Sequence, residues 1–195
     1  MALSELRTHE IVRKAIHISS SAIPLLYWFI FTRDVMLRGV LILAFGFLLA
    51  EYLRLHFSQI RKIFMLIFGS AIRNHEHEKL TGATYVFTGA VLSIFLFSKE
   101  VAVTSLLILS VSDTLAALIG IPFGKHKFLS KSFEGSTAFF LSTLIILSIF
   151  IPQQVLLNVI ISIALTLLEA SPIRIDDNFS IPLLAGCLLS LTSLL

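Results

Sequence analysis

The stretch that decides the fold runs from Ser110 to Phe140 and reads SVSDTLAALIGIPFGKHKFLSKSFEGSTAFF. An apolar run that contains Asp113 leads into a segment rich in glycine, lysine and serine, and a second apolar run follows it. An ionisable side chain inside a membrane helix is costly and marks a functional site by default. Glycines let backbone amides approach an anion closely, and lysines supply positive charge for phosphate oxygens. The stretch therefore predicts a metal–nucleotide site at a membrane surface.

Composition places the whole chain in the membrane. Hydrophobic residues make up 56 % of the 195 residues and charged residues 14 %, against about 25 % in ordinary soluble domains. The mean hydropathy is +0.94. We therefore expect a single integral membrane domain over residues 1–195, all-α, built as a polytopic helical bundle. Seven segments are apolar and nearly long enough to cross a hydrocarbon core of roughly 30 Å: 11–31, 35–55, 82–98, 101–120, 136–151, 155–170 and 180–195. The stretch at 60–72 is about half a span, which predicts an interfacial or re-entrant helix.

The basic residues predict the orientation. No small-residue cleavage site follows the first apolar run, so we expect this span to be retained. If the N-terminus is cytoplasmic, twelve of the fifteen Lys and Arg side chains fall on the inner side, including Arg7 and Arg174. Arg33, Arg38 and Lys99 fall on the outer side, as the positive-inside rule requires. The polar segments 54–81, 121–135 and 170–180 then lie on the cytoplasmic face. Nucleic acid is an unsuitable partner, because the basic residues are divided among loops that also carry acids.

Two basic motifs lie near helix ends. In Arg13-Lys14-x-x-His17, helical spacing stacks Arg13 and His17 one turn apart. Orientation of the first span and phosphate binding both remain open as its role. The pair Glu51-x-x-Arg54 closes the second span, and a helix-end ion pair is the favoured interpretation.

The segment from Arg73 to Tyr85 carries alternating histidines and acids, RNHEHEKLTGATY. A zinc site on His75, His77, Glu76 and Glu78 is disfavoured, since the His spacing is not i,i+4 and no cysteine pair is present. We expect instead that Glu78 lies where a helix begins, with Thr81 as its N-cap. Gly82, Thr84, Thr88 and Gly89 form a strip of small side chains that lets helices approach closely.

Asp113 and Gly120 share a helix face with Ser110 and Ala117, about 10 Å apart over seven residues. Packing explains the small residues, but a carboxylate there needs a partner, and hydrated Mg²⁺ is a suitable one. Beyond Pro122, the segment resembles a phosphate-wrapping loop without being a Walker A motif. Its candidate phosphate ligands are Gly120, Gly124, Lys125, Lys131, Ser132, Gly135 and Ser136.

A further acidic turn precedes the last span. Asp176, Asp177 and Asn178 are poor residues for hydrophobic insertion but suit a hard divalent cation, which prefers oxygen ligands. Capping of the last helix by Asn178 or Ser180 is the alternative, and it leaves Glu169 unexplained. Cys187, the only cysteine, lies in an apolar span and is expected to be structural.

These motifs resemble the polyprenol kinase family, which includes dolichol, phytol and farnesol kinases and the CTP-dependent diacylglycerol kinase. The resemblance covers almost the whole chain and rests on the order of its motifs. These are Arg13-Lys14-x-x-His17, Ser112-Asp113-Thr114-x-Ala116-x-x-x-Gly120-x-x-x-Gly124, Lys131-Ser132-x-Glu134-Gly135-Ser136 and Glu169-x-x-Pro172…Asp176-Asp177-Asn178-x-x-x-Pro182. The chain is distantly similar to phosphatidate cytidylyltransferase, whose own signature is absent.

The resemblance implies transfer of the γ-phosphate of CTP to a lipid alcohol, with a divalent metal, at the cytoplasmic face of the membrane. The expected acceptor is a shorter isoprenoid alcohol or diacylglycerol. Asp113, Glu134, Asp176 and Asp177 are then the candidate metal ligands. Arg13, Lys14, His17, Lys125 and Lys131 are the candidate phosphate ligands. Asp113 or Asp177 accepts the alcohol proton, and Lys131 is the third residue expected to be catalytic. A cytidylyltransferase, a small transporter and a membrane scaffold are the alternatives, and a homodimer is plausible.

Overall fold

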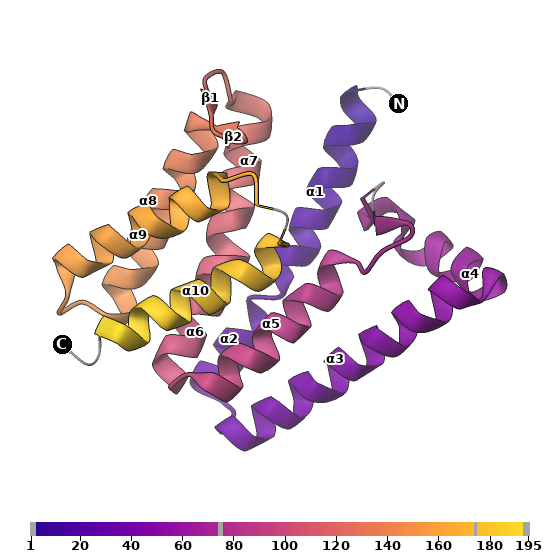
Figure 1. Cartoon of the computed structure of the whole chain (residues 1–195), viewed down its shortest axis with the longest axis horizontal. Coiled ribbons are helices and arrows are strands. Elements are labelled where there is room, and N and C mark those ends of the chain that lie inside the picture. Colours follow the sequence, from indigo (N-terminus) through magenta and orange to yellow (C-terminus); the bar gives the residue numbers. More distant parts are fainter. Residues whose placement is uncertain (1–2, 74–75, 174, 193–195) are drawn as a thin grey trace.

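The computed structural model describes residues 3–73, 76–173 and 175–192, with side chains described over 10–73, 76–173 and 175–191. Helices dominate this part of the chain, as the sequence predicts, and they pack side by side in one bundle (Figure 1). The helices are α1 (Leu3–Ser19), α2 (Ala22–Phe29), α3 (Arg33–His56), α4 (Ser58–Phe68), η1 (Gly69–Ala71), α5 (Gly82–Leu96), α6 (Lys99–Leu107), η3 (Ile108–Ser112), α7 (Asp113–Phe123), α8 (Phe133–Phe150), α9 (Val155–Ala170) and α10 (Asp177–Thr192). Two short strands, β1 (Lys127–Phe128) and β2 (Lys131–Ser132), form a hairpin.

Three helical stretches in the described residues are long and apolar enough to cross a membrane: Arg33–His56, Lys99–Phe123 and Phe133–Phe150. The last of the three begins three residues before the predicted span at 136–151. The predicted spans at 82–98, 155–170 and 180–195 are shorter apolar helices of 15 or 16 residues. The count of seven spans and the cytoplasmic N-terminus therefore stay predictions. The predicted half-span at 60–72 is indeed a short helical segment, formed by α4 and η1.

The predicted first span at 11–31 is divided between two helices. The helix stops at Ser19 and restarts at Ala22, after a turn. Pro24 has no N–H to donate to the carbonyl of Ser20, so the ladder cannot run through unbroken. The N–H of Ile23 donates to that carbonyl instead, at 3.0 Å. The hydroxyl of Ser20 donates to the carbonyl of His17 at 2.6 Å, a type of bond that bends helices.

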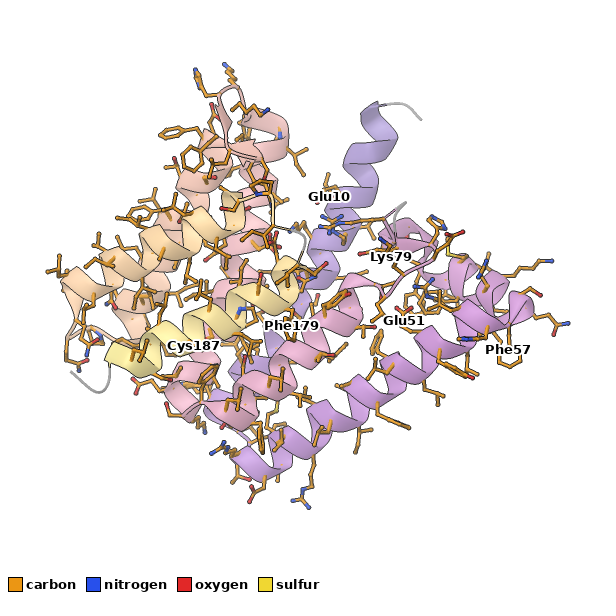
Figure 2. All side chains as sticks on the ribbon, viewed as in Figure 1. Glu10, Glu51, Phe57, Lys79, Phe179 and Cys187 are labelled. Carbon is orange, nitrogen blue, oxygen red and sulfur yellow. The ribbon has the colours of Figure 1, made fainter. Side chains whose placement is uncertain are left out.

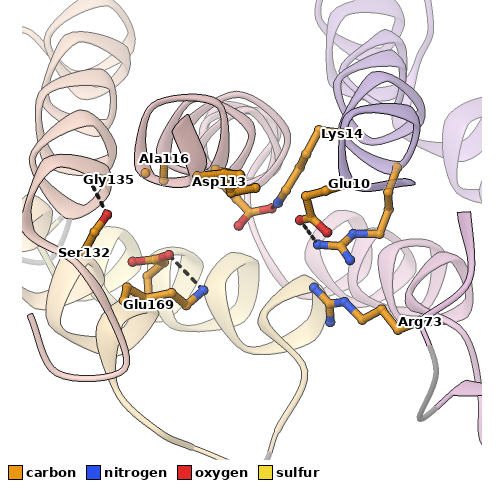
Figure 3. A pocket seen from close by; sticks show the side chains of 13 residues that line it. Glu10, Lys14, Arg73, Asp113, Ala116, Ser132, Gly135 and Glu169 are labelled. Atoms are coloured by element: carbon orange, nitrogen blue, oxygen red, sulfur yellow. Dashed lines mark hydrogen bonds and ion pairs between the residues drawn. The ribbon is translucent and has the colours of Figure 1, made fainter. Parts of the chain in front are cut away.

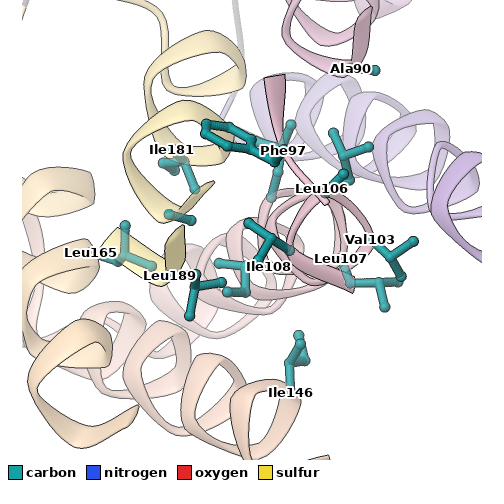
Figure 4. Close-up of a cluster of buried hydrophobic side chains, with 14 of the residues drawn as sticks. Ala90, Phe97, Val103, Leu106, Leu107, Ile108, Ile146, Leu165, Ile181 and Leu189 are labelled. Atoms are coloured by element: carbon teal, nitrogen blue, oxygen red, sulfur yellow. The ribbon is translucent and has the colours of Figure 1, made fainter. Parts of the chain in front are cut away.

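The apolar core surrounds α6, whose residues Val101 to Leu107 are all buried. Figure 4 shows side chains of α6 and η3 meeting Ile181 and Leu189 of α10 and Leu165 of α9. Phe97, at the turn before α6, packs against α10 where Gly186 leaves room. A Cβ on Gly186 would lie 2.0 Å from Cε2 of Phe97, so this contact requires glycine. Cys187 on the same helix is a free, exposed thiol (Figure 2).

The small residues Gly82 and Gly89, at the start and in the middle of α5, do bring helices together. A Cβ on Gly89 would lie 2.8 Å from the carbonyl oxygen of Asn178, at the beginning of α10. The amide of Asn178 also donates to the carbonyl of Gly82 at 3.4 Å. The first turn of α5 and the first turn of α10 are therefore fixed against each other, which places the acidic turn of residues 176–178 beside α5.

Candidate functional site

A buried ion pair joins α1 to α7. The ammonium of Lys14 contacts the carboxylate of Asp113, and both residues are less than 8 % exposed. Nε2 of His17 lies 3.2 Å from Oδ2 of the same carboxylate and 3.1 Å from the carbonyl oxygen of Leu109. Because both neighbours are acceptors, we assign the ring proton to Nε2. Asp113 therefore has cationic and N–H partners from α1, and a metal ion is not needed to explain its burial.

A second cluster lies across the cavity from Asp113. Nζ of Lys131 is 3.0 Å from Oε1 of Glu169 and 3.3 Å from Oδ2 of Asp177. Burial alone would lower the pKa of Lys131, but these two carboxylates outweigh it and raise the pKa above its ordinary value. Glu169 is 3 % exposed, and its Oε2 has no hydrogen-bond partner among the residues that the structure describes. A buried carboxylate oxygen without a partner is costly, so this atom favours a cationic or hydroxyl ligand.

Lys14 and Asp113 of the first cluster line a polar cavity of about 240 Å³. Lys131 and Glu169 of the second cluster line it too, whereas His17 and Asp177 lie outside this lining. Figure 3 shows Lys14, Asp113, Glu169 and Arg73 facing this common space from four separate segments. The small residues Ala116, Ala117 and Gly120 of α7 form part of its wall. Its ionisable lining residues are four cations and three acids: Arg13, Lys14, Arg73, Lys131, Glu10, Asp113 and Glu169.

The hairpin sets the position of Lys131. Lys127 pairs with Ser132 and Phe128 with Lys131, which leaves Leu129 and Ser130 as a two-residue turn. The N–H and hydroxyl of Ser130 both donate to the carbonyl of Ala170, at 2.9 and 2.7 Å. These bonds tie the hairpin to the end of α9 and hold Leu129 at a φ of +50°, an uncommon value for leucine. The lysine is thus placed beside Glu169 by a rigid turn.

The predicted phosphate-wrapping loop is therefore different from its expected form. Lys125 is exposed and lies outside the cavity lining, as does Gly124. A Cβ on Gly124 would lie 2.7 Å from the Ser132 side chain, so this glycine serves packing. Ser132 caps α8, where its hydroxyl accepts the N–H of Gly135 at 3.2 Å. Gly120 and Gly135 do line the cavity, but they also let α7 and α8 approach, whereas Ser136 is buried outside the cavity lining.

The predicted set of four metal-binding acids is not brought together. Glu134 contacts His126 at 2.8 Å, on the hairpin side of α8. Asp176 accepts the N–H of Asn178 at 2.9 Å, so the helix cap is Asp176 and not Asn178 or Ser180. Asp176 also lies 3.9 Å from Arg73. Among the described residues no group of three or more His, Cys, Asp or Glu side chains is arranged to hold a metal ion.

The segment between η1 and α5 is held by a buried clamp. Arg54 is fully buried and its Nε donates to Oε2 of Glu51 at 2.5 Å, the helix-end ion pair that the sequence favoured. Its guanidinium also donates to the carbonyls of Glu76, His77 and Lys79. Figure 2 shows Glu51 on α3 and Lys79 on this segment.

Thr81 is the N-cap residue of α5, but its hydroxyl donates to Glu51 at 2.5 Å and caps no helical N–H. Glu78 lies four residues before α5, near the helix entry as predicted, but it is exposed and outside both cavity linings. The clamp thus satisfies Glu51 and fixes the start of α5 at the same time.

Glu76 accepts hydrogen bonds from two backbone N–H groups, and these bonds explain the position of Arg73. Its carboxylate accepts the N–H of Arg73 at 2.9 Å and the N–H of Gly82 at 3.1 Å. His77 and Glu78 are exposed, and His75, Arg7 and Arg174 fall outside the residues whose side chains are described. Sequence reasoning missed Glu10 and Arg73 as cavity residues. Arg73 follows an apolar run, and only the Glu76 turn brings it back beside α1.

A larger, mostly apolar cavity of about 400 Å³ adjoins the polar one. It shares Arg13, Lys14, Arg73 and Asp113 with the polar cavity. Aromatic residues of α3, α4 and α5 form part of its lining, together with aliphatic residues and with polar residues such as His17, Thr81 and Asp177.

The chain is similar to an uncharacterized protein of Rickettsia prowazekii, with 34 % identity over 182 aligned positions that cover 88 % of each chain. The two proteins belong to one family. The chain is also 32 % identical to CTP-dependent diacylglycerol kinase 1 of Eremothecium gossypii, over 73 % of this chain and 46 % of that protein. The chain therefore spans about half the length of that relative.

CTP-dependent diacylglycerol kinase 1 of Schizosaccharomyces pombe is 26 % identical over 95 % of this chain and 94 % of its own length. These homologues support membership of the polyprenol and lipid kinase family. With the apolar helices, they also support a membrane protein. No family model and no solved structure matches the chain.

Proposed function

We propose that this protein is a CTP-dependent lipid alcohol kinase, which transfers the γ-phosphate of CTP to the hydroxyl of diacylglycerol or an isoprenoid alcohol. The observation that carries the proposal is the junction of two cavities at Asp113. One cavity is polar and holds four cations, and the other is mainly apolar. Phosphoryl transfer to a lipid needs this pairing, because one substrate is a polyanion and the other a hydrocarbon.

In the proposed mechanism, Arg13, Arg73 and Lys131 neutralise the oxygens of the triphosphate. Phosphoryl transfer depends mainly on positioning and charge neutralisation, which fixed cations supply. The alcohol oxygen bonds to the γ-phosphorus, the bond from that phosphorus to the β–γ bridging oxygen breaks, and CDP leaves. Asp113 accepts the hydroxyl proton, and Lys14 and His17 hold its carboxylate in position.

A divalent cation fits beside Glu169 and Asp177. The Oε2 of Glu169, which has no hydrogen-bond partner among the described residues, would be one oxygen ligand. The carboxylate of Asp177, 3.3 Å from the Lys131 ammonium that also contacts Glu169, would be another. Mg²⁺ in phosphate sites uses one or two carboxylates, keeps several waters and takes the remaining oxygens from the substrate. Such an ion supplies neutralisation of the β- and γ-phosphate charge. We further propose that this site faces the cytoplasm, where CTP is available.

The test is a lipid kinase assay with purified protein in mixed micelles. CTP labelled at the γ- or the α-phosphate, and ATP in parallel, is offered with diacylglycerol, farnesol and phytol. We expect label from γ-labelled CTP in the lipid product, and a loss of 10²-fold or more in kcat for Asp113→Asn, on the order of the contribution of a general base.

Lys131→Ala should raise the KM for CTP, while Lys125→Ala, at an exposed lysine outside both cavities, is the matched control. A CDP-lipid with release of pyrophosphate would instead identify a cytidylyltransferase. Unchanged phosphorylation in both site variants would remove these residues from the mechanism.

A further inference from the structure

The apolar cavity has walls of a distinct kind. Phe47 of α3 stacks on Phe87 of α5 with ring centroids 4.7 Å apart. Phe64 and Phe68, one turn apart on α4, have ring centroids 5.0 Å apart. All four line the cavity, together with Leu43. These residues give part of the wall hydrocarbon and aromatic faces, which bind alkyl or isoprenoid chains.

This cavity ends at the proposed reacting group. Asp113, Lys14 and Arg13 belong to the linings of both cavities. The Asp113 carboxylate therefore faces both the polar cavity and the apolar one, which we call the aromatic cavity after its four phenylalanines. The polar residues Asp176, Asp177 and Asn178 lie at the aromatic cavity too, at the start of α10. One end of the cavity is therefore polar and charged, and the other is apolar. An amphiphile with a single polar end matches this distribution.

The helices that form the apolar walls also present apolar surface outside. On α4, Ile63, Leu66 and Ile67 are 59 to 87 % exposed, although Phe64 and Phe68 of the same helix line the cavity. On α3, a candidate membrane span, Ile42 and Phe45 are at least 70 % exposed. Large exposed apolar surfaces of this kind mark contact with lipid or a partner. Because α3 is itself a candidate span, a lipid tail in the bilayer would lie against the same helix that lines the cavity.

From these observations we infer that the aromatic cavity is the acceptor site. It binds the hydroxyl-proximal segment of one membrane lipid alcohol, with the hydroxyl at Asp113 and the rest of the tail in the bilayer. This inference rests on the proposed function and extends it to the acceptor. A volume of about 400 Å³ is in the lower part of the range of roughly 300–1,000 Å³ for small-molecule sites. It accommodates the beginning of a tail, so recognition depends on the first carbons and not on total chain length.

The test fills the cavity from a small side chain in its wall. Ala83→Leu, near the start of α5, and Ala71→Leu, in η1, each add three carbons to the lining. We expect the KM for the lipid alcohol to rise at least tenfold, with the KM for CTP unchanged within twofold. Ala50→Leu, on α3 and outside both linings, is the matched control. Thermal unfolding of each variant in micelles identifies any variant that fails to fold, and Phe47→Ala, which enlarges the cavity, then replaces it and should also raise the lipid KM.

Photolabelling separates this inference from the proposed function. An alcohol carrying a diazirine near its hydroxyl end is irradiated with the wild-type protein in nanodiscs, without nucleotide. We expect labelled peptides from residues 43–47, 64–71 and 83–87, and less labelling in Ala83→Leu. Labelling in these segments, combined with no phosphorylated lipid in the separate assay with CTP, would refute the kinase and retain the lipid site. Kinase activity with labelling concentrated on α8 and α9, or with unchanged lipid KM in both filled variants, would overturn the acceptor site alone.

Discussion

Removing the guanidinium of Arg54 should unfold the region that presents Arg73. The side chain is fully buried, and its partners are the Glu51 carboxylate and three backbone carbonyls between residues 76 and 79. Arg54→Met keeps much of the volume but leaves Glu51, which is 1 % exposed, with Thr81 and Thr84 as its remaining donors among the described residues. Breaking a buried ion pair by removing one partner typically costs about 3–5 kcal/mol. We expect a loss of that size in the free energy of unfolding.

The assay is equilibrium unfolding of the purified protein in micelles by SDS titration, with the KM for CTP as a second measurement. Glu51→Gln combined with Arg54→Met should lose less than the sum of the single losses, since no unpaired charge remains buried. Arg61→Met is the control. Arg61 also donates to backbone carbonyls, but it is exposed, and about 1 kcal/mol or less is expected. A loss below about 1 kcal/mol in Arg54→Met, or additive losses in the double variant, would refute the argument from burial.

Three further predictions follow from single contacts. Gly186→Ala should lower the unfolding free energy by about 1–3 kcal/mol, the usual cost of overpacking, because the added Cβ would clash with the ring of Phe97. Gly46→Ala is the control, since an added Cβ there meets no neighbouring described group within 4 Å, and equal stabilities of the two variants would contradict the prediction. Glu169→Gln should raise the Mg²⁺ concentration needed for half-maximal activity about tenfold, which corresponds to about 1.4 kcal/mol of binding free energy. Titration of Mg²⁺ into chelator-treated protein measures this concentration, and an unchanged value would exclude the Glu169 carboxylate as a ligand. The folded-state pKa of Lys131 is raised above its ordinary value of 10.5, so its ion pairs stabilise the fold below that pH and lose this effect as the pH rises through the folded-state pKa. The difference in melting temperature between wild type and Lys131→Gln should therefore hold from about pH 7 to 9.5 and shrink above about 10.5. A difference that grows with pH would show that the sign of this argument is wrong.

The sequence predicted the helical class because it rests on composition and on long apolar runs, which need no tertiary information. The ends of α3 and α9 fall within two residues of the predicted spans, since charged or small residues mark both. Asp113 stood out for the same reason, as one carboxylate in an apolar helix. The pairing of Glu51 with Arg54 followed from i,i+3 spacing alone.

The partners of the site residues could not be read from the sequence. Lys14 and Asp113 are 99 residues apart, and helix packing alone brings them into contact. A loop rich in glycine and lysine is compatible with phosphate binding, yet here a two-residue turn pairs its strands and leaves Lys125 in solvent. Arg73 enters the cavity through the turn capped by Glu76, which the pattern of alternating histidines and acids obscured.

One irregular turn has a consequence for the whole central helix. Lys99–Phe123 is a single stretch of 25 residues, but its middle, Ile108–Ser112, is a π turn. A π turn accommodates one extra residue, which advances every later position by about 100° in helical phase. Deleting one residue from this turn would restore a regular backbone ladder and swing Asp113 away from Lys14. A variant shortened in this way should have a higher folding stability but no catalytic activity, so the π turn represents a trade-off between stability and activity.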